Sequence, residues 1–159
     1  MSHIQEAAFG AGCFWGVEDR FRVLPGVVMT EVGYMGGKTD HPTYDDVCSD
    51  DSGHAEVVHL QFDSDKLSYE QLLDLFWRSH NPTTLNRQGP DEGSQYRSVI
   101  FTYSDDQMRL AKISKQALTD LHRWPNPIVT EIVFAPAFHR AEEYHQQYLQ
   151  KRGLDSCHI

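Results

Sequence analysis

The stretch AAFGAGCFWGVEDRF, residues 7–21, contains the transition from a strand to a helix that decides the fold of this chain. We expect a strand from about Ile4 to Phe9 and a helix from about Phe14 to Leu24. The helix is predicted because apolar residues recur at the spacing of one helical face; they are Phe14, Val17, Phe21 and Leu24. Pro25-Gly26 then ends the helix. Cys13 therefore lies between two glycines, directly before the first turn of a helix.

Hydrophobic periodicity and helix-start signals predict the other elements. Helices are expected to begin at Ser68, where Ser68-x-x-Gln71 forms a capping box, and at Ser104, and a final helix is expected over 137–152. Polar loops are expected at 38–53 and 81–97, and strands at 27–37, 54–62, 98–103 and 128–134. The order of these elements predicts an α+β fold, a mixed β-sheet with helices packed against it in a two-layer, ferredoxin-like sandwich or roll.

Composition and charge exclude several classes of protein. The chain has 159 residues, of which 40% are hydrophobic, and this suits one globular domain. It carries 14 basic and 23 acidic residues, a net charge of -9, without a Lys/Arg run, which disfavours nucleic acid and anionic membranes as partners. No apolar run reaches the roughly 18 to 20 residues of a membrane span, and no signal peptide is visible. We therefore expect a cytoplasmic protein with a single domain over 1–159, in which 153–159 form a mobile C-terminal tail carrying Cys157.

The three cysteines, Cys13, Cys48 and Cys157, do not suggest a secreted disulfide framework or a closed zinc site. Cys13 is either a small core residue or a reactive thiol, because the partial positive charge of a helix N-terminus lowers a thiol pKa. Phe14 and Trp15 point about 100° apart on a helix, so one of them can line a pocket beside Cys13 while the other packs. Cys48 lies among aspartates that disfavour a thiolate, so we do not expect it to be the nucleophile. Cys157 is either incidental or a thiol that can meet another thiol.

Glu56 is the second candidate for chemistry. In HAEVVHLQF the period-two pattern places it on one strand face with His54 and with three apolar residues, namely Val58, Leu60 and Phe62. Burial there would raise its pKa and keep it protonated near neutral pH, so that it can donate a proton. The alternative is a glutamate that reaches solvent or pairs with an arginine.

Several other polar residues admit both a functional and a structural interpretation. Tyr44 and Tyr96 lie in the two polar loops and are either functional or packing residues. Asp91 suits the turn in which it lies. His54 and His145 are either acids and bases or ordinary hydrogen-bonded histidines.

Five motifs in order resemble those of a known family. They are GCFWG at 12–16, GYMGG at 33–37, PTYDDVCSDDSGHAEVV at 42–58, GSQYRS at 93–98 and FHRAEEYHQQYL at 138–149. From about Phe9 to Leu149 the chain resembles the A-type peptide methionine sulfoxide reductases. The resemblance implies the catalytic domain of an oxidoreductase that converts methionine (S)-sulfoxide, free or in proteins, to methionine and so repairs oxidised proteins.

The resemblance also implies a role for each candidate residue. Cys13 would attack the sulfoxide sulfur and become a sulfenic acid, and Glu56 would protonate the sulfoxide oxygen. That oxygen would accept hydrogen bonds from Tyr44 and Tyr96, and further residues would support substrate binding: Phe14, Trp15, Asp91 and His54. Cys157 would condense with the sulfenic acid to form a redox-active disulfide, which thioredoxin, or a glutaredoxin in its place, would reduce. No cofactor and no metal would be needed.

The sequence departs from the family where Gly89-Pro90-Asp91 replaces the usual Gly-Asn-Asp, and we expect Cys48 to be dispensable. Two alternatives stay open: a thiol peroxidase or redox sensor that oxidises Cys13 with peroxide, and a small interaction domain whose GCFWG stretch is core. A protonated Glu56 favours the reductase, because peroxide reduction has no evident need for a neutral acid.

Overall fold

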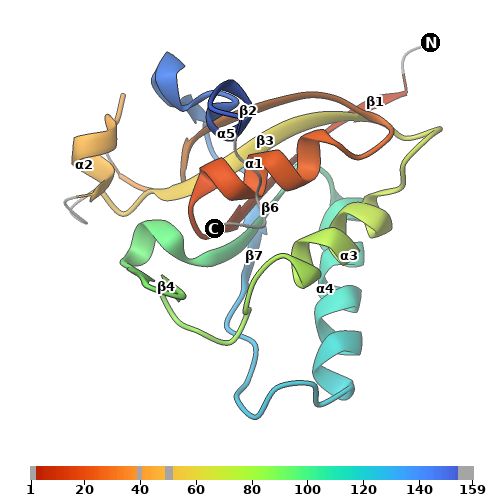
Figure 1. Ribbon diagram of the computed structural model, residues 1–159. Helices are drawn as coiled ribbons and strands as arrows, with labels where there is room; N and C mark the ends of the chain where they lie inside the picture. The colour runs from red at the N-terminus through yellow and green to blue at the C-terminus, as the bar shows by residue number, and fades with distance from the viewer. Residues whose placement is uncertain (1–2, 39–40, 49–51, 154–159) are drawn as a thin grey trace.

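The structure is a computed structural model that describes residues 3–38, 41–48 and 52–153. Its main feature is a six-stranded sheet in the order β7-β6-β1-β3-β2-β8 (Figure 1). The strands are β1 (Ile4–Ala11), β2 (Val27–Met35), β3 (Ala55–Asp63), β6 (Ser98–Thr102), β7 (Glu131–Phe134) and β8 (His139–Arg140). β7 runs parallel to β6, and the other neighbouring pairs are antiparallel. The expected α+β class with a mixed sheet is therefore confirmed.

Three helices pack against one face of this sheet: α1 (Phe14–Arg22), α3 (Tyr69–Arg78) and α4 (Asp105–Asp120). Figure 1 shows α1 lying across the sheet and α3 beside α4. The strands contribute alternate side chains to this core, because successive residues of a strand point to opposite faces. Fully buried members of the core are Phe9, Phe21, Leu60, Phe76 and Ala111.

The three helices α1, α3 and α4 begin where the sequence predicts. Ser68 accepts a hydrogen bond from the Gln71 N–H, and the Gln71 side chain accepts one from the Ser68 N–H, which completes the expected capping box of α3. Ser104 likewise accepts a hydrogen bond from the Gln107 N–H at the start of α4. These contacts pair N–H groups that a helix start otherwise leaves without partners.

The opposite face of the sheet carries a smaller apolar cluster. Ala8, Val57 and Phe101 are buried there, and Phe138 packs against them from the segment that follows β7. The central strand β3 is consequently buried on both faces. The period-two pattern predicted only one buried face of this strand. Such a pattern reports which residues share a face, but it does not report which segments of the chain cover each face.

Two loops and the C-terminal segment differ from the prediction. The expected loop at 38–53 contains α2 (Tyr44–Cys48). The expected loop at 81–97 contains a hairpin of β4 (Arg87–Gln88) and β5 (Asp91–Glu92), then the 3₁₀ helix η1 (Ser94–Tyr96). The helix expected over 137–152 is wrong, because this segment forms β8, a 3₁₀ helix η2 (Glu143–His145) and a short α5 (Tyr148–Lys151). β8 pairs with Gly33 and Tyr34 of β2, and this pairing with the sheet edge replaces a continuous helix.

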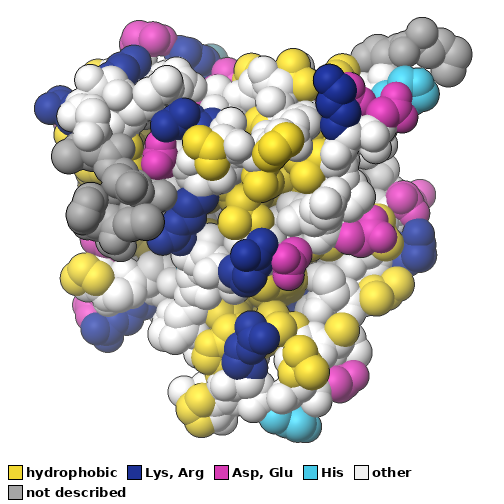
Figure 2. Space-filling view, turned by 45° about the vertical axis from the view of Figure 1, so that its right-hand side comes forward, with side chains coloured by type: hydrophobic (Ala, Val, Ile, Leu, Met, Phe, Trp, Pro, Cys, Tyr) yellow, Lys and Arg dark blue, Asp and Glu magenta, His cyan; other side chains and the backbone are white. Residues whose placement is uncertain are grey.

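Figure 2 shows the side of the molecule on which α3 and α4 lie. Basic and acidic side chains are interspersed there among apolar ones, without a cluster of one sign. Arg78 and Asp74 of α3 form an ion pair at 3.0 Å. Within the described parts of the chain, no helix has both the length and the apolar character needed to cross a membrane.

Candidate active site

Cys13 lies between the end of β1 and the first residue of α1, as the sequence predicts. The preceding Gly12 has a φ of +102°, which residues with a side chain rarely adopt, and this turn leads the chain from the sheet into the helix. Cys13 is partly exposed and lines a cavity of about 460 Å³. Arg20, His80 and Asp91 line the same cavity.

The environment of Cys13 keeps its thiol protonated. Burial raises the pKa of Cys13 to about 12, and the carboxylate of Glu56 adds to this effect. The backbone N–H groups of Trp15 and Gly16 lower the pKa by smaller amounts. The lowered thiol pKa expected at a helix N-terminus is therefore wrong for this structure. The helix start does act on the sulfur, but desolvation of the thiolate outweighs it.

Glu56 lies on β3 next to the start of α1. It is 1% exposed, and its Oε1 accepts a hydrogen bond from the Phe14 N–H at 3.2 Å. Its Oε2 is buried and has no hydrogen-bond partner among the described residues. Burial raises the pKa of Glu56 to about 8, opposed by the Phe14 N–H and assisted by Asp91. The carboxyl is therefore mostly protonated at neutral pH, as expected from its strand face.

The two tyrosines of the polar loops both come within electrostatic reach of Glu56. Tyr44 is the first residue of α2 and Tyr96 the last residue of η1. Burial raises the pKa of both hydroxyls, and negative charge on Glu56 raises both further. The Tyr44 hydroxyl lies close enough to the Cys48 thiol for each to shift the pKa of the other. Tyr96 is also influenced by the charge of Cys13, so the four groups surround one region.

Asp91 and His54 have different relations to this region. Asp91 lines the cavity together with Cys13, and its charge raises the pKa of both Cys13 and Glu56. The Nδ1 of His54 accepts a hydrogen bond from the Gly37 N–H at 3.0 Å. The contact of His54 therefore supports the glycine turn after β2.

Cys48 and Cys157 are the other two cysteines that the sequence analysis considered. Cys48 is exposed at the end of α2. Burial of its sulfur and negative charge, chiefly on Glu56 and Asp45, raise its pKa, which agrees with the expectation that it does not ionise readily. Cys157 lies outside the residues that the structure describes.

Phe14 and Trp15 point in different directions, as their positions on a helix require. Phe14 is buried against Tyr34, with ring centroids 5.7 Å apart. Trp15 is only partly buried. Its indole stacks on the ring of Tyr148 with centroids 3.8 Å apart and planes 8° apart, and its Nε1 donates to Nδ1 of His145 at 2.9 Å.

Sequence reasoning missed Tyr34 and Glu142. The Tyr34 hydroxyl donates to Oε1 of Glu142 at 3.0 Å, and Oε2 of Glu142 accepts from the Tyr44 N–H at 3.0 Å. Glu142 therefore fixes the start of α2 and the Tyr34 ring, on which Phe14 packs. Both residues lie within motifs that resemble the family, Tyr34 in GYMGG and Glu142 in FHRAEEYHQQYL. Membership in these motifs is the feature of the sequence that could have identified them.

Together these groups define the chemistry that the site can perform. A thiol, a protonated carboxyl and two phenols suit attack on an electrophilic atom whose oxygen must be protonated before it can leave. Phe14 and Trp15 do not line the cavity beside Cys13, so an apolar wall formed by their rings stays a prediction from the sequence. Across the described ranges, no cluster of three or more His, Cys, Asp or Glu side chains is arranged to hold a metal ion.

The chain is similar to a known enzyme family and to solved structures. The family model described as peptide methionine sulfoxide reductase matches residues 5–159. The peptide methionine sulfoxide reductase MsrA of Methanothermobacter thermautotrophicus is 57% identical over 159 residues, which cover 100% of this chain and 94% of that protein. Mxr1 from Saccharomyces cerevisiae in reduced form is 39% identical with a TM-score of 0.86, covering 95% of this chain and 87% of that one. Mxr1 in complex with Trx2 is matched at 26% identity and a TM-score of 0.62, covering 92% and 85%.

Proposed function

This chain belongs to the peptide methionine sulfoxide reductase family, and from that premise we propose that Cys13 reduces methionine (S)-sulfoxide, free and in oxidised proteins. The observation that carries the role of the site is the state of Glu56. One of its carboxyl oxygens is held by the Phe14 N–H, and the other is buried without a partner among the described residues. A sulfoxide oxygen beside Oε2 would supply the missing partner and receive the proton.

The reductase step balances with the groups at this site. Glu56 donates its proton to the sulfoxide oxygen while the sulfur of Cys13 bonds to the sulfoxide sulfur. The Glu56 carboxylate takes the proton of the Cys13 thiol as this bond forms. The sulfur–oxygen bond and the new sulfur–sulfur bond then break, the hydroxyl passes to the Cys13 sulfur, and methionine leaves. The products are methionine and a sulfenic acid on Cys13, with Glu56 protonated again. Because the Cys13 thiol is protonated before substrate binds, loss of its proton is part of the reductase step.

The remaining candidates orient the substrate. Tyr44 and Tyr96 donate hydrogen bonds to the sulfoxide oxygen. Phe14 and Trp15 hold the methyl group on the sulfur and exclude water from it. Asp91 and His54 contribute to the polar side of the pocket and to the turn beside it.

The catalytic cycle closes through thiol–disulfide exchange. The Cys157 thiol condenses with the sulfenic acid of Cys13, which forms a disulfide and releases water. A dithiol reductant then reduces this disulfide and becomes oxidised itself. Thioredoxin is the proposed reductant, because Mxr1, a relative of this chain, has been solved in complex with Trx2. A glutaredoxin would be chemically equivalent.

The test is reduction of separate S and R epimers of a methionine sulfoxide peptide with dithiothreitol as reductant. We expect turnover of the S epimer only, and none in Cys13→Ser. Cys48→Ser is the matched control, since it removes a thiol outside the mechanism and keeps a hydroxyl beside Tyr44; we expect full activity. Equal turnover of both epimers, or activity that survives in Cys13→Ser, would refute the proposal.

A further inference from the structure

The cavity beside Cys13 has room that the proposed reaction does not use. It has a volume of about 460 Å³, and Cys13 and Asp91 line it. The other groups that act on the sulfoxide in the proposed reaction do not line it; they are Phe14, Trp15, Tyr44, Glu56 and Tyr96. The cavity is therefore available to the part of the substrate that lies beyond the sulfoxide group.

One face of α1 forms a wall of this cavity. Positions i, i+3, i+4 and i+7 share a face of a helix. Four residues with this spacing all line the cavity, namely Cys13, Gly16, Val17 and Arg20. Gly16 places no side chain between the thiol at one end of this wall and the guanidinium at the other, so a ligand can lie along the wall between them.

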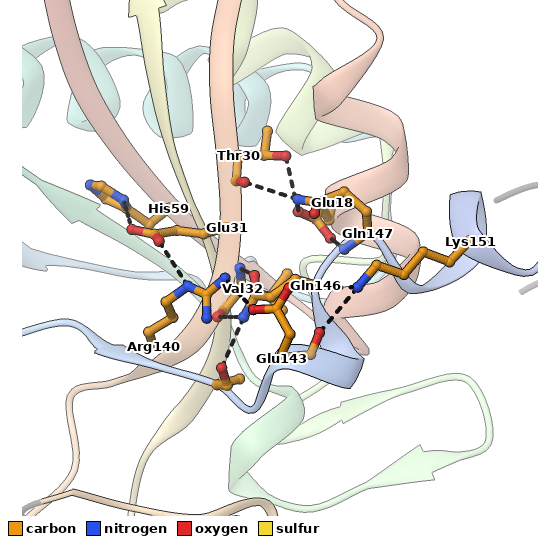
Figure 3. A network of polar contacts seen from close by, with 11 residues as sticks. Glu18, Thr30, Glu31, Val32, His59, Arg140, Glu143, Gln146, Gln147 and Lys151 are labelled. Carbon is orange, nitrogen blue, oxygen red and sulfur yellow. Dashed lines mark hydrogen bonds and ion pairs between the residues drawn. The ribbon is translucent and has the colours of Figure 1, made fainter.

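Helix α1 is held from its other side (Figure 3). Glu18 is 1% exposed, and it lies two positions before Arg20, about 200° around the helix. Its carboxyl group accepts hydrogen bonds from the backbone and side-chain N–H groups of Gln147, each at 2.7 Å, and from the hydroxyl of Thr30 at 2.9 Å. The wall that carries Arg20 therefore belongs to a helix whose orientation is fixed.

The guanidinium of Arg20 has one hydrogen-bond partner within the described residues. Its Nη1 donates to the carbonyl of Ser79, at the C-terminal end of α3. A cation there stabilises the helix end, but this contact uses only one of several N–H donors of the guanidinium. No carboxylate of the described chain forms an ion pair with Arg20, although the net charge of the protein is -9. Arg20 is therefore a partly buried cation with donors left for a ligand.

The charges around the cavity favour an anion at Arg20. His80 also lines the cavity, and burial, assisted by the charge of Arg20, lowers its pKa to about 4, so it is neutral at pH 7. Asp91 acts at the thiol end, because its charge raises the pKa of both Cys13 and Glu56. An anionic group in the cavity is therefore repelled from the thiol end by Asp91 and attracted by Arg20.

We infer that Arg20 binds a carboxylate of the substrate while the sulfoxide sulfur lies at Cys13. Two sources supply this chemistry. One is the α-carboxylate of free or C-terminal methionine sulfoxide, and the other is an acidic side chain next to an oxidised methionine in a peptide. The inference rests on the proposed function for the identity of the substrate.

The dimensions of the substrate agree with this assignment. Cys13 and Arg20 are seven positions apart, which corresponds to a rise of about 10 Å along a helix. Four bonds of about 1.5 Å join the sulfoxide sulfur to the α-carboxyl carbon, so an extended substrate covers about half of that rise. An arginine side chain, which leans toward the N-terminus of its helix, can cover the remainder.

The first measurement compares two small substrates that differ in one carboxylate, N-acetyl-methionine (S)-sulfoxide and its N-methylamide, with dithiothreitol as reductant. In the unmodified protein KM should be about three- to tenfold lower for the carboxylate, the range expected from a partly exposed hydrogen bond to a charged group. The kcat should differ less. High ionic strength should reduce this preference, because salt screens the attraction.

Variants of Arg20 test whether this residue is the source of the preference. Arg20→Met should abolish it, because KM for the carboxylate rises while KM for the amide stays. Arg20→Lys should keep part of it, since lysine retains the charge but not the planar fork. Arg123→Met is the matched control: it removes the same charge outside this cavity, and the preference should remain. The ratio of the two KM values separates carboxylate binding from support of α3, because a folding defect affects both substrates alike.

The second measurement distinguishes the two sources of the carboxylate. It compares an acetylated and amidated dipeptide of methionine (S)-sulfoxide and aspartate with the same dipeptide containing asparagine. A lower KM for the aspartate peptide that disappears in Arg20→Met supports binding of an acidic neighbour. Equal KM values for the two peptides, together with the preference for N-acetyl-methionine sulfoxide over its amide, support binding of the α-carboxylate alone.

The inference is overturned by equal KM values within both pairs of substrates in the unmodified protein, or by a preference that persists unchanged in Arg20→Met. Should Arg20→Met not fold, Arg20→Gln decides the question in the same way, and a preference that ionic strength leaves unchanged in the unmodified protein would also contradict it. A protein that reduces neither the carboxylate nor the amide would refute the proposed function instead.

Discussion

Cys13 and Glu56 hold two protons next to each other, and this arrangement decides how the site can work. Both pKa values are raised, to about 12 for the thiol and to about 8 for the carboxyl, and burial is the main cause in each case. Each ionised group would also repel charge on the other. At neutral pH the pair therefore rests as a thiol and a carboxylic acid. Slow alkylation of Cys13 at pH 7 would accordingly be consistent with catalysis, and it does not identify the residue as inert packing.

At the residue scale, Glu56→Gln tests whether Glu56 is the general acid of the reductase step. The amide keeps the shape of the side chain but cannot transfer a proton to the sulfoxide oxygen. Since general acid catalysis typically contributes about 10²- to 10⁴-fold, we expect single-turnover formation of methionine to slow by a factor in that range. Glu70→Gln on α3 is a control for the same substitution away from the site. An unchanged single-turnover rate in Glu56→Gln would remove Glu56 from the mechanism.

Glu56→Gln should also change how the free energy of unfolding depends on pH. The unfolded chain releases the Glu56 proton near pH 4.5, whereas the folded protein keeps it until about pH 8. Because the folded state binds the extra proton between these values, the stabilising contribution of the protonated carboxyl is full below pH 4.5 and is lost as pH rises toward 8. Glu56→Gln has no such loss, so its free energy of unfolding should increase relative to the unmodified protein over this interval and level off above it. Urea titrations at several pH values measure the difference, and a pH-independent difference would contradict the raised pKa.

At the scale of elements, the C-terminal segment shows how tertiary contacts override helical periodicity. Its residues were expected to form one helix over 137–152, yet the chain forms β8, η2 and the four-residue α5. Gln147 takes a left-handed conformation with φ +48°, which costs energy for a residue with a side chain. Its two hydrogen bonds to Glu18 and the bonds of Gln146 to Val32 offset that cost.

Gln146→Ala tests whether these bonds hold the segment. The substitution leaves the Val32 N–H without its partner inside the protein, and an unpaired buried group is destabilising. We expect the free energy of unfolding to fall by about 2 to 3 kcal/mol. Gln150→Ala, an exposed glutamine two residues into α5, is the matched control and should change it by less than about 0.5 kcal/mol. Equal effects of the two substitutions in urea titrations would show that the Gln146 bonds do not hold the segment.

At the scale of the whole molecule, the proposed cycle joins residues from both ends of the chain. Cys13 follows the first strand, and Cys157 belongs to residues outside those that the structure describes. Cys157→Ser should still form about one methionine per chain without reductant, because the first step needs only Cys13. Turnover with thioredoxin should fail in this variant, since no disulfide forms for thioredoxin to reduce. Normal thioredoxin-dependent turnover would refute the assignment of Cys157.

Much of the fold could be predicted from local sequence. The capping box at Ser68 and the apolar face of α1 depend on residues three or four positions apart, and both predictions are confirmed. The short α2 and the β4–β5 hairpin were missed, because their sequences consist of turn-forming and polar residues without hydrophobic periodicity. Of the site, Cys13 and Glu56 were identified by position. Glu142 received no role and the two interpretations of His145 stayed open, because the partners of both residues lie about 100 residues away or more.

The sequence by itself determined where the main strands and helices begin, which face of β3 carries Glu56, and that a thiol stands at the start of a helix. These features follow from the spacing of residues along the chain, which sequence displays directly. Only the tertiary structure decided that Cys13 rests as a thiol, that one oxygen of Glu56 has no partner, and that His145 accepts the Trp15 N–H. Each of these depends on desolvation or on hydrogen bonds between distant segments, and such quantities exist only once the chain has folded around the group.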